Sequence, residues 1–322
     1  MLERDLEAPA NTSMCPGYRS SYDPMSFKLS PICVPALDLE SYMRTRSLKH
    51  RRNVKKPGTQ AAIKLVYQYK PRSVSELYDL CTADDWATFL YASDQQFNTC
   101  LQTAFELYIK DCLELQRRDR WEYLMSFANY DAEQEYELVR LFATQGIDPT
   151  VFARNLKAIL NCTYTKLNCL KIWGVPDSGK SLFSHLLAET FIVCYMNNQG
   201  SANQFYLSNM LNKSLIICDE LFLTPGTADD FKSVLGGAKV DVDKKNKEKQ
   251  ILSRTPIIIT TNYRKFGRGL LHHEDEVALA KRCISYHFYY EFTPSCRIEV
   301  PAFAHFLFLC LNQDMIDDSE TV

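Results

Sequence analysis

Apolar residues recur along the chain at two different spacings, and the change falls near residue 166. From about Ser73 to Asn161 they lie three and four positions apart, as in "NTCLQTAFELYIKDCLELQRR", which is the spacing of one helical face. From Leu167 onward, helical segments alternate with the short apolar runs "NCLKIW", "FIVCYM", "SLIICDE" and "TPIIITTN". Runs of this length suit strands buried on both faces of a parallel sheet. The pattern predicts a small all-α bundle over residues 73–165, followed by an α/β domain over residues 166–322.

The first 72 residues show neither spacing. Seven of the 13 prolines fall there, and we expect this segment to be extended or disordered. Near its end lies a basic cluster, "KHRRNVKK" (Lys49–Lys56). Such a cluster is a solvated run of charge, a nuclear import signal or an arm that contacts DNA. The import signal would place the protein in a host nucleus, and otherwise we expect it in the cytoplasm.

Composition narrows the class of protein. The 322 residues are 46% hydrophobic and 24% charged, as in an ordinary globular protein, and the net charge of −2 means that DNA binding requires a local basic patch. The apolar run "FAHFLFLCL" (Phe303–Leu311) is too short to span a bilayer, so we expect a buried helix there and no membrane partner. The twelve cysteines form no CxxC pair, which indicates reduced thiols rather than a zinc site or a disulfide framework.

The segment "GVPDSGKS" matches the phosphate-binding pattern G-x-x-x-x-G-K-[ST] at every fixed position. An apolar strand precedes it and a helix follows, so its backbone N–H groups would point at phosphate oxygens from the start of a helix. We expect Lys180 to reach the β- and γ-phosphates of ATP, and Ser181 to offer its hydroxyl to Mg²⁺. The residues expected to bind the nucleotide are Gly174, Val175, Pro176, Asp177, Ser178, Gly179, Lys180 and Ser181.

Two later strands end in residues that suit the same chemistry. "LIICDE" ends in Asp219, which can hold Mg²⁺, and Glu220, which can polarise the attacking water. Taken alone, this pair would be more typical of a strand that ends in solvent, but the phosphate loop upstream favours the catalytic interpretation. The strand Pro256–Thr260 is followed by Thr261 and Asn262. The Asn262 amide can bond the γ-phosphate or the water, or it caps a turn, or both.

A long segment between these strands predicts a β-hairpin. "AKVDVD" alternates, "KKNKEK" interrupts the alternation, and "QILSRTP" resumes it. The lysine-rich tip of such a hairpin suits contact with a polyanion. A solvated turn is the simpler alternative for this segment taken alone.

These motifs, in this order, resemble the superfamily 3 helicases of small DNA viruses, and in particular the helicase domain of the parvovirus large non-structural replication proteins. The resemblance covers roughly Gly146–Phe292 and is carried by "GVPDSGKS", "LIICDE", "FKSVLGGAKVDVDKKNK" and "TPIIITTN". It implies a P-loop NTPase of the AAA+ type with a central parallel sheet. It also implies a ring-forming homo-oligomer that hydrolyses ATP to unwind DNA for replication of a small viral genome.

The resemblance assigns further roles. Asn262 would be the sensor of hydrolysis, and Lys245 and Lys247 fall where the family's hairpin lysines contact DNA. "LAKRCISYHF" resembles the segment that carries an arginine finger, so Arg282 would reach into the ATP site of a neighbouring subunit. The preceding helices would form the oligomerisation collar. The catalytic residues expected on this basis are Lys180, Glu220, Asn262 and Arg282.

One family feature is missing from this sequence. Larger members carry a nicking domain with a His-hydrophobic-His metal motif, and none of the six histidines here forms it, so nicking is not supported. Two alternatives to a DNA helicase remain open. One is an ATPase of the RNA-virus superfamily 3 type, against which the lysine hairpin argues. The other is a captured or truncated viral fragment acting as a non-catalytic assembly module, against which the intact catalytic set argues.

Overall fold

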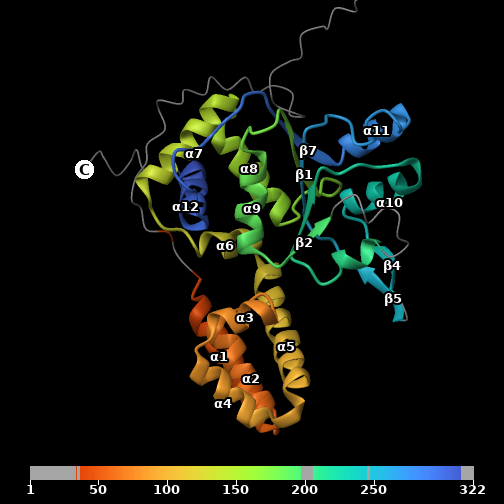
Figure 1. Cartoon of the computed structure of the whole chain (residues 1–322). Helices are drawn as coiled ribbons and strands as arrows, with labels where there is room; N and C mark the ends of the chain where they lie inside the picture. Colours follow the sequence, from red (N-terminus) through yellow and green to blue (C-terminus); the bar gives the residue numbers. More distant parts are fainter. Residues whose placement is uncertain (1–33, 35–36, 197–205, 245–246, 313–322) are drawn as a thin grey trace, which may run out of the picture. The chain divides into compact units, whose positions relative to one another are not determined.

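The chain folds into two units in the computed structural model, which describes residues 34, 37–196, 206–244 and 247–312 (Figure 1). One unit is helical and comprises Ala36–Asp119. The other unit includes the chain from Arg120 onward and contains a parallel sheet with helices on both faces. This agrees with the expected order of an all-α region followed by an α/β domain. Among the described residues, no helix is long and apolar enough to cross a membrane.

The helical unit contains five helices among its described residues, with a single 3₁₀ turn at Asp94–Gln96 before the last of them. They are α1 (Leu39–Asn53), α2 (Pro57–Tyr69), α3 (Val74–Leu80), α4 (Ala83–Ser93) and α5 (Phe97–Arg118). Side-chain caps begin three of them, at Asp38, Ser73 and Thr82. Apolar residues of α2 form the centre of the unit, with Ala62, Ile63 and Val66 fully buried.

The expectation that residues 1–72 are extended is wrong where the structure describes them, because α1 and α2 lie there. The expectation rested on the many prolines of this segment, and Pro57 is one of them. It is the first residue of α2, where a missing N–H costs nothing, so it starts a helix instead of excluding one. The first 33 residues lie outside the described part of the chain.

A buried carboxylate connects three helices of this unit. Asp111 of α5 has a side chain only 1% exposed. It accepts hydrogen bonds from Arg46 Nε (2.9 Å) and Tyr67 Oη (2.5 Å), and His50 Nε2 lies 2.8 Å away. Burial raises the pKa of Asp111, but these partners outweigh burial, and the net pKa is lowered. Part of the basic cluster Lys49–Lys56 therefore has a structural role, since His50 belongs to it.

The α/β unit is built on five parallel strands in the order β2-β3-β6-β1-β7. They are β1 (Cys169–Gly174), β2 (Val193–Met196), β3 (Leu215–Asp219), β6 (Ile257–Thr261) and β7 (Cys283–Phe288). The first four lie in the apolar runs identified in the sequence, so the predicted parallel sheet is confirmed. β7 was not predicted as a strand. It is an edge strand whose exposure alternates, and "CISYHF" therefore lacks the continuous apolar run of the inner strands.

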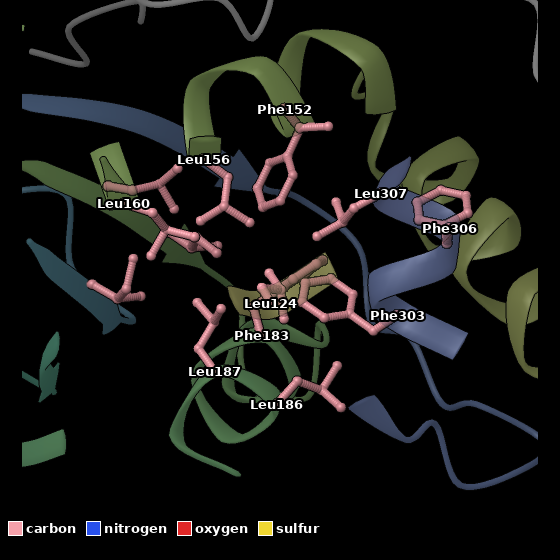
Figure 2. Packing of buried hydrophobic residues seen from close by; sticks show 14 of the residues in the cluster. Leu124, Phe152, Leu156, Leu160, Phe183, Leu186, Leu187, Phe303, Phe306 and Leu307 are labelled. Atoms are coloured by element: carbon pink, nitrogen blue, oxygen red, sulfur yellow. The ribbon is translucent and has the colours of Figure 1, made fainter. Parts of the chain in front are cut away.

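One face of the sheet packs against a core rich in phenylalanine (Figure 2). Five helices contribute to it: α6 (Arg120–Met125), α7 (Ala132–Gln145), α8 (Pro149–Leu160), α9 (Lys180–Thr190) and α12 (Val300–Leu311). Phe152, Phe183, Phe303 and Phe306 are all at most 1% exposed. The helix expected over Phe303–Leu311 is confirmed as part of α12.

This core corrects the predicted boundary at residue 165. The helices α6, α7 and α8 belong to the α/β unit, because their apolar faces are buried in the core under its sheet. Arg120, for example, donates through Nε to the carbonyl of Ser214, 2.8 Å away, just before β3. A helical spacing shows that a face is apolar, but it does not show which layer covers that face.

The other face of the sheet carries a second core with α10 (Pro225–Leu235), α11 (His273–Ala280) and the 3₁₀ turn Tyr206–Met210. The predicted β-hairpin is present between β3 and β6 in the sequence. β4 (Val240–Lys244) pairs antiparallel with β5 (Lys247–Leu252). Its Val242 and Leu252 are buried in this second core, so the base of the hairpin is anchored to the unit.

We expect Asp111→Asn to destabilise the helical unit by about 2–4 kcal/mol at neutral pH, because it leaves the partly buried Arg46 guanidinium without its anion. The folded-state pKa of Asp111 is lowered, so its contribution is present above the unfolded pKa and is lost as pH falls through the folded value. The difference from wild type should therefore shrink below about pH 4. Urea unfolding of the full chain at pH 7 and pH 3 measures both effects.

Glu114→Gln is the matched control, since Glu114 contacts the same Arg46 but its side chain is 50% exposed. It should change stability little at either pH. An Asp111→Asn protein as stable as wild type at pH 7 would contradict the structural role of this carboxylate.

Candidate nucleotide-binding site

The carboxyl ends of β1, β3 and β6 bring most of the predicted site together. Asp219 at the end of β3 lies opposite Thr260 of β6, and Thr261 lies opposite Trp173 of β1. The phosphate loop follows Trp173 directly, so the loop, the acidic pair and Asn262 all lie at the same end of the sheet. The structure thus brings together the predicted loop, metal and water-activating residues, which come from three separate parts of the sequence.

The loop Gly174–Ser181 has the backbone conformation of an anion-binding turn. Gly174 has φ 148°, and a Cβ there would lie 1.9 Å from the carbonyl oxygen of Phe288 in β7. Asp177 and Gly179 have left-handed φ values of 50° and 88°. Gly179 is also the N-cap of α9, so successive N–H groups and the positive end of the helix converge on the loop.

Lys180 places its ammonium group inside this turn. The residue is 7% exposed, and Nζ donates to the Gly174 carbonyl (3.3 Å) and to Ser178 Oγ (3.2 Å). Burial lowers the pKa of Lys180, while the negative charges of Glu220, Asp177 and Asp219 oppose that shift. The ammonium is bound by neutral oxygens of the loop, which phosphate oxygens can replace. These residues fit ATP.

Residues outside the motif hold the loop in place. Gln145, at the end of α7 and 2% exposed, donates through Nε2 to the carbonyls of Ser178 (3.3 Å) and Tyr290 (2.6 Å). Phe292 N–H donates to the carbonyl of Asp177 at 2.8 Å. Sequence reasoning missed Gln145, because a glutamine at a helix end carries no motif and its burial depends on a segment 145 positions away.

The acidic pair is held mainly by the end of β6. Asp219 Oδ1 accepts from Thr260 Oγ1 at 2.7 Å. Glu220 has a left-handed φ of 51°, and its Oε1 accepts from the backbone N–H of Asn262 at 2.9 Å. Asn262 and Ser181 are exposed at the same end of the sheet. Ser181 and Asp219 thus offer, at this end of the sheet, the oxygen ligand types that fit Mg²⁺.

Arg282 lies at the opposite end of the sheet. It directly precedes β7, and its carbonyl accepts from Asn168 N–H (3.3 Å) at the start of β1. The far end of β7, at Phe288, is the part that lies beside Gly174, so one strand length of about 15–20 Å separates Arg282 from the loop. Its guanidinium donates to the carbonyl of Ala278. The structure does not bring Arg282 to the loop of its own chain, and its role toward a neighbour stays a prediction.

The hairpin lysines are only partly described. Lys245 lies outside the described residues, and Lys247 is the first residue of β5, opposite Lys244. Their contact with DNA therefore also stays a prediction. Within the described part of the hairpin, Lys249 lies 3.4 Å from Asp243 in an exposed ion pair.

Known proteins share this sequence pattern and this fold. The chain is 24% identical over 211 residues to the initiator protein NS1 of human parvovirus B19 (isolate AU), covering 64% of this chain and 31% of that protein. It is 29% identical over 177 residues to the replication protein E1 of human papillomavirus 66, covering 53% of this chain and 24% of that protein. The chain thus spans about a third or less of the length of these curated relatives.

A solved structure of the JCV helicase matches the fold with a TM-score of 0.51 at 12% identity, covering 87% of both chains. This likeness confirms the expected AAA+-type P-loop NTPase fold. The model of the family described as parvovirus non-structural protein NS1 matches residues 39–265. That match covers more than half of the chain and includes the phosphate loop, the acidic pair and the hairpin. The chain therefore belongs to the parvovirus NS1 family, within the superfamily 3 helicases.

Proposed function

We propose that this chain is an ATP-hydrolysing DNA helicase that works as a ring and unwinds DNA during replication of a small viral genome in the host nucleus. One observation carries the proposal. A buried ammonium, a turn of converging N–H groups and two carboxylates meet at the carboxyl ends of three adjacent strands. The names of the relatives, an initiator protein and a replication protein, support a role in replication.

Each group at this end of the sheet has a chemical task in the proposed reaction. The loop N–H groups and Lys180 bind and orient the phosphates, and Ser181 and Asp219 would hold Mg²⁺, which supplies charge neutralisation when bound. Glu220 polarises a water molecule and takes its proton as the water attacks the γ-phosphate. The exposed amide of Asn262, whose backbone N–H donates to Glu220, would sense the loss of that phosphate.

We expect Lys180→Ala to abolish ATP turnover while the fold persists. Loss of one charge-assisted phosphate contact costs about 1.5–3 kcal/mol in binding, and more in the transition state, where charge builds up on the phosphate. ATP hydrolysis measured with and without single-stranded DNA tests this and shows whether DNA stimulates the activity. Lys166→Ala, an exposed lysine before β1, is the control and should hydrolyse normally. Turnover near wild type in Lys180→Ala would remove this site as the source of activity.

The hairpin is tested by replacing Lys245 and Lys247 together with alanine. Two lost phosphate contacts should reduce the slope of log affinity against log salt by about 1.4 for single-stranded DNA, at roughly 0.7 per contact. Basal hydrolysis should survive, because neither lysine is among the residues proposed to bind or hydrolyse ATP. An unchanged salt slope in a binding titration would place the DNA contact elsewhere, and the cluster Lys49–Lys56 would be tested next.

Arg282 tests whether the protein works as a ring. An arginine that reaches a neighbour's γ-phosphate contributes on the order of 10³-fold or more in related phosphoryl transfers, so Arg282→Ala should bind ATP but hydrolyse it poorly. Mixing it with Lys180→Ala protein should restore activity, since mixed assemblies contain interfaces with one intact loop and one intact arginine. If Arg282 only caps α11 through the Ala278 carbonyl, hydrolysis per folded molecule should stay near normal, and the ring proposal for this residue fails.

A further inference from the structure

Arg268 contacts the proposed water-activating residue, and no sequence motif marks it. It lies in the segment between β6 and α11. Its Nη2 is 3.3 Å from Glu220 Oε2 and 3.4 Å from the Glu220 carbonyl oxygen. One guanidinium nitrogen therefore contacts both the main chain and the carboxylate of the same residue. In contrast to Arg282, Arg268 lies at the carboxyl end of the sheet within its own chain.

The guanidinium of Arg268 is itself fixed in place. Its Cζ lies 3.9 Å from the ring centroid of Tyr263 and 5.3 Å from that of Phe222, so the cation is flanked by two aromatic rings. Its backbone adopts a left-handed φ of 48°, an uncommon conformation for a residue other than glycine. Such a conformation persists where the surrounding structure imposes it.

The loop around Arg268 is tied to α11. The carboxylate of Glu276 accepts from the N–H groups of Phe266 (2.9 Å) and Gly267 (2.7 Å). A Cβ on Gly267 would lie 2.4 Å from Leu271, so the turn requires glycine at this position. These contacts fix the backbone position of Arg268, and the two aromatic rings then fix the position of its guanidinium group.

A contribution to folding stability does not by itself account for the ion pair between Arg268 and Glu220. The side chains of Arg268 and Glu220 are 32% and 38% exposed, and exposed pairs contribute only ~0–1 kcal/mol. Orientation of the Glu220 carboxylate accounts for this ion pair better. Glu220 Oε1 accepts from Asn262 N–H, and Oε2 lies near both Thr261 Oγ1 (3.3 Å) and Arg268, so donors on both oxygens restrict rotation of the carboxylate.

We propose that Arg268 is a positioning residue for ATP hydrolysis, which acts by holding the Glu220 carboxylate in the orientation that accepts a proton from the attacking water. This inference rests on the proposed function, since it assumes that Glu220 is the base. A carboxylate held by donors at both oxygens presents its remaining lone pairs in a defined direction, whereas a freely rotating one is aligned only part of the time. Arg268 acts through Glu220 and does not bind ATP itself.

The test compares ATP hydrolysis by wild type, Arg268→Ala and Arg268→Lys. We expect Arg268→Ala to lower kcat by about 10–100-fold, as loss of an orienting partner commonly does, with KM for ATP within about 2-fold of wild type. Arg268→Lys keeps the charge but loses the planar group, and it should recover part of kcat. Arg264→Ala is the matched control, because it removes the same charge from an exposed position on the same segment, where Arg264 lies 6.0 Å from the Trp173 ring.

A second comparison separates action through Glu220 from other roles. In a Glu220→Gln background the base is already absent, so adding Arg268→Ala should leave the residual rate unchanged. A further loss in that background, or a rise in KM equal to the fall in kcat, would mean that Arg268 binds the nucleotide directly and would overturn the proposal. A kcat that stays the same or increases in Arg268→Ala would also overturn it.

Lys180→Ala measured alongside distinguishes the two proposals. Hydrolysis that depends on Lys180 but not on Arg268 would overturn only the positioning role. Wild-type protein without Lys180-dependent hydrolysis would defeat the proposed function, and the role of Arg268 would fall with it. Circular dichroism of each variant confirms that the rates refer to folded protein.

Discussion

The pairing of β6 with both β1 and β3 is the constraint on which the site depends. Every residue of β6 is buried, and its register places Thr261 opposite Trp173 on one side and Thr260 opposite Asp219 on the other. A shift of one residue would turn each side chain of β6 to the opposite face and would move the threonines away from the acidic pair. The pairing of β6 with both neighbours thus sets the position of Asp219 and Glu220 relative to the phosphate loop.

The same end of the sheet combines a buried ammonium, whose charge burial disfavours, with carboxylates whose charges repel one another. Lys180 is largely buried, which disfavours its charge, yet the negative charges of Glu220, Asp177 and Asp219 favour that charge. The acidic residues are in turn held by hydroxyl, amide and guanidinium donors. These groups hold one another in place, and electrostatic preorganisation of this kind is the main source of the rate enhancement that the proposed chemistry requires.

The sequence was sufficient for the parts of the fold that depend on local pattern. The inner strands are continuous apolar runs, and the phosphate loop has fixed residue types because its backbone conformations require them. β7 was missed because Ser285 and His287 interrupt its apolar run. α1 and α2 were missed because residues 1–72 are rich in proline and show no sustained apolar spacing, although one of those prolines, Pro57, begins a helix. Gln145 and Arg268 had no local signal at all. Their roles come from contacts with distant segments, which only the folded chain brings together.

The proposal that Arg282 acts on the ATP site of a neighbouring subunit follows from the direction of the strands. In a parallel sheet all carboxyl ends lie together, so a residue that precedes a strand is at least one strand length away from a loop that follows another strand. Arg282 precedes β7 and the phosphate loop follows β1, and no side chain spans that distance of about 15–20 Å within one unit. Arg268 contacts the acidic pair in its own chain, where it already pairs with Glu220. If a second arginine is to stabilise charge on the γ-phosphate, Arg282 can provide it only from another subunit, so hydrolysis would depend on assembly for a geometric reason.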